Sequence, residues 1–277
     1  EHELLQQVSS QSGGIIYIPV VVHVIHNGDA YGTNENITDE QVQSQITVMN
    51  QDFRRMLGTP GHNTNPVGAD VQIEFVLAKV DPNGNPTNGI NRVNLCQASW
   101  STTAINSTVK PATIWSPNDY MNMWSVNFTD GGLLGYAQFP SASGLAGMPF
   151  DGGAANTDGV VAGYRFFGSS ALAPGNYAAP YDRGRTMTHE VGHYLGLRHI
   201  WGDGPCGDDD FCSDTPESDA PNEGCPTTHV SCGTTDMVRN YMDYTNDTCM
   251  NIFTQNQKTR MITVMNNSLR RASLKTS

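Results

Sequence analysis

Two histidines and a glutamate stand in the chain at a spacing that metal chemistry uses. His189 and His193 are four residues apart, and Glu190 directly follows the first of them. On a helix, residues i and i+4 lie one above the other on the same face, so both imidazoles can reach one metal ion. Glu190 points in another direction and is free to act on a water molecule. The pattern H-E-x-x-H therefore predicts a helical zinc site with its own base.

A third ligand is expected after a reversal of the chain. Gly196 permits that reversal because it lacks the Cβ atom that opposes a positive φ, and His199 follows three residues later. Three imidazoles leave a coordination position for water, whose pKa zinc lowers to about 7. Glu190 would take the proton of that water during attack on a peptide carbonyl and pass it to the leaving amine. We predict that His189, His193 and His199 hold one zinc ion.

The complete string H-E-x-x-H-x-x-G-x-x-H resembles the zinc motif of the metzincin peptidases. The resemblance implies a methionine-containing turn beneath the metal, and residues 240–244 (NYMDY) match it with Met242. Tyr244 stands where some metzincins place a tyrosine that binds the tetrahedral intermediate. A phenol there could donate a hydrogen bond to the developing oxyanion. Met242 is otherwise an ordinary core residue, and Tyr244 a packing residue.

Four segments narrow the resemblance to the pappalysin family, in particular its compact, ulilysin-like members. They are residues 17–25, 189–203, 214–216 (DTP) and 240–251, the last of which ends in CMN. Membership implies a zinc-dependent endopeptidase that hydrolyses extended polypeptides. One alternative is a catalytically silent, calcium-dependent binding module, against which the intact Glu190 argues. Another is an astacin-like metzincin, which shares the tyrosine after the Met-turn.

The cysteines indicate an oxidising compartment. Five of the six lie within residues 206–249, and their closest spacing, C-x₅-C, is wider than the C-x₂₋₄-C of zinc knuckles. Disulfides, and with them a secreted, extracellular protein, are therefore expected. The family resemblance implies the pairs Cys212–Cys232 and Cys225–Cys249. Cys96 and Cys206 remain, and pairing them is a guess among 15 possible connectivities.

Acidic residues suggest two further sites. The stretch 203–219 is rich in Asp and Glu, and calcium would neutralise it, as the resemblance also implies; Asp214 and Asp219 are the expected ligands, or else solvated loop carboxylates. Compact relatives favour a basic residue just after the scissile bond, read by an acidic group near the Met-turn. Asp247 is near that position, but Thr248 directly precedes Cys249. Alignment on Asp247 predicts the basic preference, and alignment on Thr248 predicts its loss.

Charge restricts the partners. With 27 acidic and 15 basic residues, the formal net charge of −12 repels nucleic acid and anionic lipid. No run of about 18 apolar residues occurs, so no membrane insertion is expected. The expected partners are polypeptide substrates, and the protein is expected to be a monomer.

Hydrophobic patterning predicts the elements that position these residues. Strands are expected at residues 15–25, 71–80, 121–128 and 159–167, with a short, exposed edge strand within 133–139. A backing helix over 38–58 begins with a capping box of Thr38 and Gln41. The active-site helix spans 182–195 with Asp182 as N-cap and ends at Gly196, and a closing helix spans 254–274.

These elements predict an α/β (α+β) catalytic domain of the metzincin type. A twisted mixed sheet with the backing helix and the active-site helix forms an upper subdomain over residues 15–196. Residues 197–277 form an irregular, disulfide-stapled lower subdomain that contains the Met-turn. Residues 1–14 are a flexible lead-in or the remnant of a pro-segment. The substrate is expected in the cleft between the subdomains, paired with the edge strand.

Overall fold

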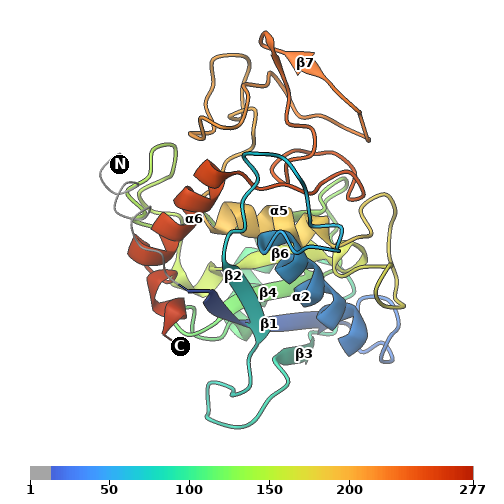
Figure 1. Ribbon diagram of the computed structural model, residues 1–277. Helices are drawn as coiled ribbons and strands as arrows, with labels where there is room; N and C mark the ends of the chain where they lie inside the picture. The colour runs from blue at the N-terminus through green and yellow to red at the C-terminus, as the bar shows by residue number, and fades with distance from the viewer. Residues whose placement is uncertain (1–13, 277) are drawn as a thin grey trace.

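A mixed, mostly parallel β-sheet is the frame of the molecule in the computed structural model, which describes residues 14–276 (Figure 1). The strand order is β2-β1-β4-β6-β5, and β3 pairs with the far end of β1. β5 alone runs antiparallel to its neighbour, β6. The strands are β1 (Ile16–His26), β2 (Ile73–Leu77), β3 (Ile90–Asn94), β4 (Met121–Val126), β5 (Gly135–Ala137) and β6 (Val160–Gly163). The expected mixed sheet is confirmed.

The strand boundaries depart from the predictions where hydrophobicity misleads. β2 is shorter than the predicted strand over 71–80, because Gln72 has a positive φ of 64° directly before it. The predicted strand over 159–167 stops at β6 and continues as a 3-10 turn, Tyr164–Phe166. β3 was not predicted, since its sequence INRVN has no alternation of apolar residues and its side chains are only partly buried.

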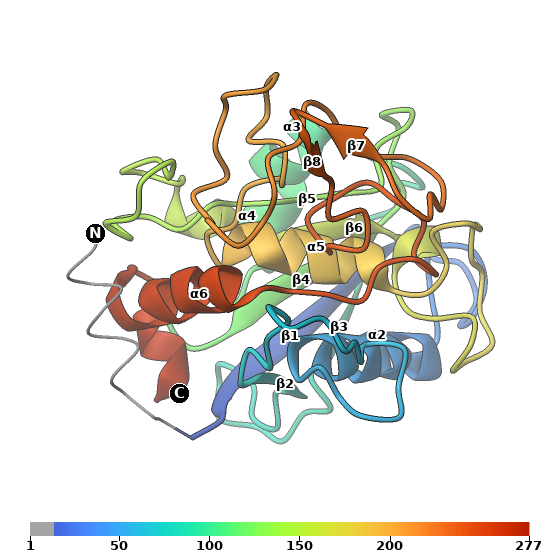
Figure 2. The same ribbon diagram turned by 45° about the horizontal axis from the view of Figure 1, so that its top comes forward.

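Both faces of the sheet are covered. Val20, Val22 and Val24 of β1 pack into the main core, which also receives side chains from α2 (Asp39–Phe53), α5 (Arg185–Tyr194) and α6 (Gln255–Asn267). On the other face, Ile25 and Trp124 pack with the helical stretch of α3 (Thr102–Ala104), the π-helical turn Ile105–Val109 and α4 (Lys110–Thr113) (Figure 2). Burial on both sides explains why β1 reads as a near-continuous apolar run.

The backing helix α2 starts as predicted but ends early. The Thr38 hydroxyl accepts a hydrogen bond from the Gln41 backbone N–H at 3.1 Å. A capping box would require the Gln41 side chain to bond back to the N-cap backbone. Instead it donates to the carbonyl oxygens of Tyr164 and Phe167, which ties α2 to the chain beyond β6. The helix ends at Phe53 instead of residue 58, because Arg55 has a positive φ.

The active-site helix α5 lies against the sheet between β6 and the C-terminal loops. Its N-cap is Gly184, with a φ of 82°, and the predicted N-cap Asp182 instead accepts a hydrogen bond from the Ser170 hydroxyl. Gly196 has a φ of 88° and reverses the chain as predicted. α6 opens with a capping box of Thr254 and Gln257, and it ends at Asn267, short of the predicted residue 274, because the backbone of Ser268 is extended.

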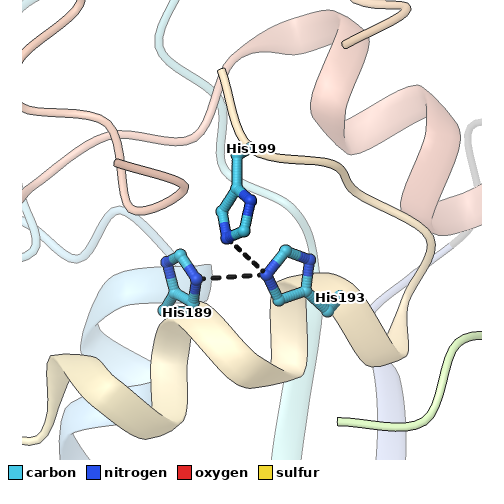
Figure 3. Close-up of side chains that lie close together, drawn as sticks. All are labelled: His189, His193 and His199. Atoms are coloured by element: carbon cyan, nitrogen blue, oxygen red, sulfur yellow. Dashed lines mark hydrogen bonds between the residues drawn. The ribbon is translucent and has the colours of Figure 1, made fainter. Parts of the chain in front are cut away.

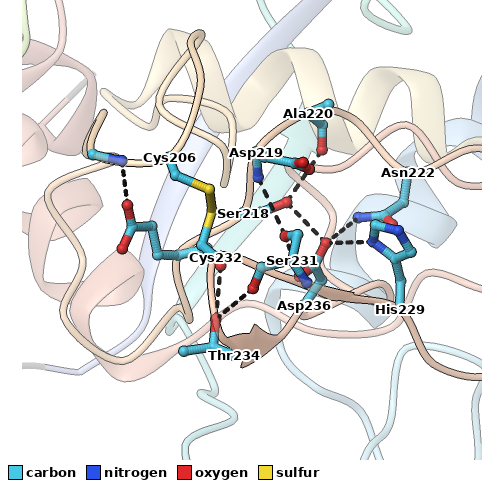
Figure 4. Close-up of a disulfide and its surroundings, with 12 residues drawn as sticks. Cys206, Ser218, Asp219, Ala220, Asn222, His229, Ser231, Cys232, Thr234 and Asp236 are labelled. Atoms are coloured by element: carbon cyan, nitrogen blue, oxygen red, sulfur yellow. Dashed lines mark hydrogen bonds and ion pairs between the residues drawn. A yellow bond between two sulfur atoms is a disulfide. The ribbon is translucent and has the colours of Figure 1, made fainter.

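Residues 202–251, here called the loop region, lie beyond α5 on the side away from β1 (Figures 1 and 2). The remaining described residues, 14–201 and 252–276, are called the sheet region. Within the loop region the regular structure is a small hairpin of β7 (Val230–Ser231) and β8 (Thr234–Thr235). The buried Asp236 carboxylate organises the surroundings of this hairpin. It accepts hydrogen bonds from the following side chains: Ser218, Asn222, His229 and Ser231 (Figure 4).

One of the two implied disulfides is wrong. The structure pairs Cys225 with Cys249, as the family resemblance implied, but it joins Cys232 to Cys206 instead of Cys212, with Cα atoms 5.5 Å apart (Figure 4). Cys212 is a buried free thiol, and Cys96 is an exposed one, so the guessed pair Cys96–Cys206 is wrong too. The reason is local: the Cys212 backbone N–H bonds to Asp210, and its carbonyl accepts from Thr215, in a turn that directs Cys212 inward.

Two predictions concern the ends and borders of the domain. The lead-in over residues 1–14 lies, apart from Gly14, outside the described residues. The division into subdomains at residue 196 stays a prediction. Along residues 14–276, no helix has both the length and the apolar character needed to cross a bilayer.

Candidate active site and metal centre

The three predicted zinc ligands converge on one point (Figure 3). His189 and His193 project from the same face of α5, and His199 returns to them after the reversal at Gly196. His193 Nε2 lies 3.1 Å from His189 Nε2 and 3.1 Å from His199 Nε2. Tetrahedral zinc with Zn–N bonds of about 2.0–2.1 Å separates its ligand nitrogens by about 3.3 Å. The separations therefore suit a single zinc ion.

The other ring nitrogens decide which atoms face the centre. His189 Nδ1 lies 2.7 Å from the Tyr241 carbonyl oxygen, and His193 Nδ1 lies 2.8 Å from the Leu197 carbonyl oxygen. His199 Nδ1 bonds to the Asp203 carboxylate. Because these partners only accept, each Nδ1 carries the proton and each Nε2 presents a lone pair. Three lone pairs facing one another repel unless a cation lies between them, so the donor set fits zinc.

Burial keeps the triad neutral. It lowers the pKa of all three imidazoles, that of His193 to about 3, and the neighbouring histidines lower those of His189 and His193 further. Neutral imidazole is the form that binds metal. The site is therefore ready for a metal ion at neutral pH without first losing protons.

Two residues that the sequence analysis missed hold His199. The Trp201 ring stacks on the His199 ring with centroids 4.2 Å apart and planes 4° apart. Asp203 reaches His199 because Gly202 and Asp203 both have positive φ values, of 64° and 69°. Arg198 closes this turn by donating to the Gly202 carbonyl at 2.8 Å and to Asp203 at 3.0 Å. The signal in the sequence is a carboxylate four residues after the third histidine.

Glu190 lies beside the triad and against the edge strand. The residue is 8% exposed, and burial raises its pKa to about 8, so its ionised form needs a cation nearby. A Cβ atom placed on Gly135 of β5 would come within 3.0 Å of Glu190 Cγ and 3.2 Å of Oε1. Glycine at position 135 therefore lets the strand pass directly over the carboxylate.

The Met-turn lies beneath the active-site helix, as the resemblance implied. Met242 is fully buried, and a Cβ atom placed on Gly192 of α5 would overlap its sulfur atom. The preceding residue, Tyr241, supplies the carbonyl that fixes His189. Asn240 exchanges two hydrogen bonds with Gln257 at the start of α6, at 3.0 and 3.1 Å. The turn is thereby anchored at both the ligand and the closing helix.

Tyr244 stands at the open side of the triad. It is 43% exposed, and its ring centroid lies 5.5 Å from that of His189 and 5.0 Å from that of His199. Burial raises the pKa of the phenol, and the negative charges of Glu190 and Asp203 raise it further, so the hydroxyl keeps its proton at neutral pH. The residue is placed to donate a hydrogen bond near the metal centre.

Asp247 lies in a cavity of about 300 Å³ next to Glu190, which Leu134, Tyr181 and Glu223 also line. Its Oδ2 accepts the backbone N–H groups of Arg183 and Arg185 at 2.7 and 3.1 Å, so Asp247 takes the capping position at the start of α5. Burial raises its pKa to about 6 against the effect of these two bonds. Asp247 and not Asp182 is thus the acidic residue at the helix N-terminus.

The two predicted calcium ligands have different surroundings. Both Asp214 oxygens serve the start of α6, by accepting from the Thr254 hydroxyl at 2.7 Å and the Asn256 N–H at 2.9 Å. Asp219 is exposed. Among the described residues, the second group of side chains with metal-ligand proximity is Cys206, Glu217 and Cys232, whose cysteines form a disulfide. Asp214 and Asp219 stay predictions as calcium ligands.

The edge strand β5 offers backbone groups to the cleft. The Leu134 carbonyl accepts from Gly163 N–H, and Gln138 N–H donates to the Gly159 carbonyl, so these two residues face β6. In an antiparallel ladder the intervening residues alternate, and the peptide groups of Gly135 and Ala137 therefore point to the open side of the strand. An extended peptide can pair there.

A sheet with one antiparallel edge strand over a three-histidine helix and a Met-turn defines a zinc metallopeptidase of the metzincin type. The chain belongs to the pappalysin family of peptidases: residues 104–266 match the family model described as pregnancy-associated plasma protein-A. Family and donor set together make it a zinc metalloendopeptidase. The predicted family and fold are confirmed.

Named relatives agree with this assignment. The chain is 32% identical to an extracellular metalloprotease of Arthroderma otae over 249 residues, which cover 89% of this chain and 76% of the relative. It is 33% identical to extracellular metalloprotease 1 of Coccidioides posadasii, over 88% of this chain and 74% of the relative. Among solved structures, mature mirolysin of Tannerella forsythia in complex with a cleaved peptide superposes with a TM-score of 0.82 at 41% identity, over 95% of this chain and 97% of that chain.

Proposed function

We propose that the protein hydrolyses internal bonds of extended polypeptides, with zinc held by His189, His193 and His199 and with Glu190 as general base. The observation that carries the proposal is the convergence of three Nε2 lone pairs beside a buried carboxylate. Zinc bound there would polarise the scissile carbonyl and acidify the attacking water. The chain's own residues supply the proton transfers and the orientation of the substrate.

Glu190 moves the proton. Its carboxylate, buried between α5 and the open strand, accepts a proton from the attacking water and returns it to the amine that leaves. The place against Gly135 supports this role, because a peptide paired with β5 passes its scissile bond over the carboxylate. Burial favours the proton-bearing form of Glu190, so proton uptake during attack is favourable.

Tyr244 stabilises the charge that develops on the carbonyl oxygen. Its phenol is protonated at neutral pH and lies on the solvent side of His189 and His199. A single oxyanion donor of this kind contributes about 10²–10³-fold to turnover where it has been measured.

The substrate lies antiparallel to β5. The free peptide groups of Gly135 and Ala137 are the pairing partners, and the complex of mirolysin with a cleaved peptide supports a polypeptide ligand for this fold. The residue after the scissile bond enters the 300 Å³ cavity, where Asp247 and Glu223 favour a basic side chain. This arrangement favours Asp247, and not Thr248, as the residue that reads the basic side chain.

The first experiment incubates wild type and Glu190→Ala with a denatured protein, with and without a zinc chelator, and identifies products by mass spectrometry. We expect cuts that the chelator abolishes, that Glu190→Ala does not make, and that precede Arg or Lys. Glu190→Ala should keep its zinc, whereas His193→Ala should lose both zinc and turnover. Full activity in either variant contradicts the mechanism, and zinc binding without cleavage by wild type would favour a binding module.

We also propose that the enzyme acts outside the cell as a monomer. The extracellular metalloproteases among its relatives and the two disulfides support this setting. Structural calcium, with Asp214 and Asp219 among its ligands, is proposed from the resemblance and the acidic stretch alone. A melting temperature that is indifferent to millimolar calcium would remove calcium from the proposal.

A further inference from the structure

The chain after α6 carries an arginine into the interior behind the cleft. Arg271 and Asp158 are each 1% exposed, and they form a bidentate ion pair: Nη1 lies 2.6 Å from Oδ2, and Nη2 lies 2.9 Å from Oδ1. Arg270 adds a third bond, from its Nε to Asp158 Oδ2 at 2.8 Å. Asp158 stands two residues before β6, so the pair fastens the C-terminal segment to the strand next to β5.

The same guanidinium reaches two further elements. Arg271 Nε donates to the carbonyl oxygen of Tyr194, the last residue of α5, at 3.0 Å. Its Nη2 also lies 3.3 Å from the carbonyl oxygen of Gln138, the first residue after β5, and the group stacks 3.3 Å above the Tyr194 ring. One side chain thus sets the active-site helix, the edge strand and β6 at fixed distances from one another.

Arg270 and Leu269 hold the loop that connects β5 with β6. Arg270 Nη2 donates to the Gly153 carbonyl at 2.8 Å and lies 3.3 Å from the Ser141 hydroxyl oxygen. Leu269 forms an isolated antiparallel bridge with Ser141. The loop therefore leaves β5 in a direction that the C-terminal segment determines.

The chain that leaves β5, residues 138–141, is here called the rim, and it borders one side of the metal centre. Phe139 follows Gln138, and its ring lies 5.5 Å from the ring of His193. The cavity with Asp247 opens at the other end of β5, at Gly132 to Gly135. A peptide antiparallel to β5 whose residue after the scissile bond enters that cavity must place its preceding residues along Ala137 and Phe139.

We propose that Arg271, held by Asp158, is a positioning residue for the substrate residues that precede the scissile bond. The proposal rests on the proposed endopeptidase function and deepens it. Arg271 lies beyond residues 104–266, the part of the chain that matches the family model. Replacing a buried ion pair by apolar residues often leaves stability unchanged, so stability alone does not account for this one. A guanidinium that donates to both oxygens of a carboxylate and to two further carbonyl oxygens fixes the relative positions of these groups, which an apolar pair does not.

The test compares two peptides built on one cleavage site mapped with wild type. The long peptide keeps four residues before the scissile bond, and the short one keeps a single, acetylated residue there. Arg271→Lys preserves the charge beside Asp158 but cannot reach Tyr194 and Gln138 at once. The double variant Asp158→Asn, Arg271→Gln removes both charges together, and it carries the test if Arg271→Lys does not fold. Arg54→Lys, in an ion pair with Asp70 at the end of α2, is the control.

We expect kcat/KM for the long peptide to fall about tenfold, mainly through KM, because the rim shifts by a fraction of an ångström. The short peptide should change less than about twofold, with zinc content unchanged, and the control should behave as wild type on both. Equal losses on both peptides, or no loss on either, would overturn the proposal. If wild type yields no cleavage site to map, the proposed function itself fails, and with it this inference.

Discussion

The sheet region and the loop region are held together by different means. In the sheet region the buried side chains are mostly apolar, and two clusters fill the two faces of the sheet. In the loop region most buried side chains are polar, and they take part in hydrogen bonds within the loops or to the ends of α5 and α6: Asp210, Thr215, Ser218, Asn222, Ser231, Asp236, Asn240, Asp243, Thr245 and Asp247. Apolar packing is non-directional and therefore tolerates small local changes. A buried hydrogen-bond network, such as the one around Asp236, loses stability when any one partner is removed.

The active site lies where the two regions meet. α5 supplies His189 and His193, while the loop region supplies the Tyr241 carbonyl and the Met242 side chain beneath them. A regular scaffold fixes the ligands, and an irregular one tunes their orientation. The comparison therefore predicts that substitutions in the sheet region mainly lower the free energy of unfolding. Substitutions in the loop region should also weaken zinc binding or turnover.

The largest effect is expected in the sheet region from Phe53→Ala. Phe53 is fully buried at the end of α2, with its ring 5.0 Å from that of Phe75 and 4.9 Å from that of Phe253. Truncation of a core phenylalanine lowers the free energy of unfolding by about 3–5 kcal/mol. Urea unfolding measures it, and the exposed Leu57→Ala, four residues on, is the control. A loss below about 1 kcal/mol would mean that apolar packing does not dominate this region.

Removing the disulfide Cys206–Cys232 tests the loop region. The double variant Cys206→Ser, Cys232→Ser frees a loop with a sequence separation of 26, which by loop-closure entropy costs about 3–4 kcal/mol. Mass spectrometry of the unreduced wild type should recover the 206–232 peptide pair, and Cys212→Ser should leave that pair intact. A 212–232 pair would restore the connectivity that the family resemblance implied.

Asp236→Asn should cost about 2–3 kcal/mol, somewhat less than the disulfide, because an amide keeps one acceptor but loses the charge. Hydrogen bonds from Ser231 and His229 lower the pKa of Asp236 against the opposing effect of burial, so the ionised form is the one the fold uses. Asn222 links Asp236 to Asp243 of the Met-turn. We therefore expect weaker zinc retention in a chelator competition. Unchanged zinc retention would mean that the hydrogen bonds of Asp236 stabilise only their own surroundings.

The same contrast explains what the sequence could predict. The helix around Val42, Ile46 and Met49 was predictable from its helical spacing. The strand over residues 15–25 was predictable because burial on both faces leaves a near-continuous apolar run, and the short strand near residue 135 because glycines flank it. The zinc ligands were predictable because helix geometry ties their spacing to the metal. The ends of α2 and α6 were misplaced because the backbone conformations of Arg55 and Ser268 decide them, and no apolar pattern encodes these.

Long-range pairing left no such trace. Cys206 and Cys212 are six residues apart in one loop, and only the inward turn of Cys212 distinguishes them. Asp182 and Asp247 compete for the start of α5, and the distant residue takes the place. Asp214 caps the start of α6 from 40 residues away, through the Thr254 hydroxyl and the Asn256 N–H. In each case the partner is chosen by the folded geometry of loops without periodic structure.

Gly192→Ala tests the contact between the two regions. In an exposed helix alanine would stabilise by about 1 kcal/mol relative to glycine, but here its Cβ atom would overlap the Met242 sulfur. We expect kcat to fall about tenfold, since the Met-turn carries the carbonyl that fixes His189. The added variant Met242→Ala should restore part of the loss by making room. Additive losses in the double variant would show that the contact does not transmit the effect.

Per pH unit, the smallest effect expected is an opposite pH dependence of stability in the two regions. Burial lowers the pKa of His23 in β1 from 6.5 to about 4, so its contribution to stability is present above pH 6.5 and is lost as the pH falls toward 4. Burial raises the pKa of Asp210 in the loop region from 3.8 to about 7, so its contribution is present below pH 3.8 and is lost as the pH rises toward 7. Each slope is at most about 1.4 kcal/mol per pH unit.

Two isosteric variants separate these slopes. His23→Gln should flatten the fall in unfolding free energy between pH 6.5 and 4 that wild type shows in urea titrations. Asp210→Asn keeps an oxygen for the Thr215 hydroxyl and should remove the loss between pH 4 and 7 without changing the acid limb. A change of the same sign in both variants would contradict the assignment, because a lowered histidine pKa and a raised aspartate pKa act on stability in opposite directions. The pH dependence of stability would then have to come from groups other than His23 and Asp210.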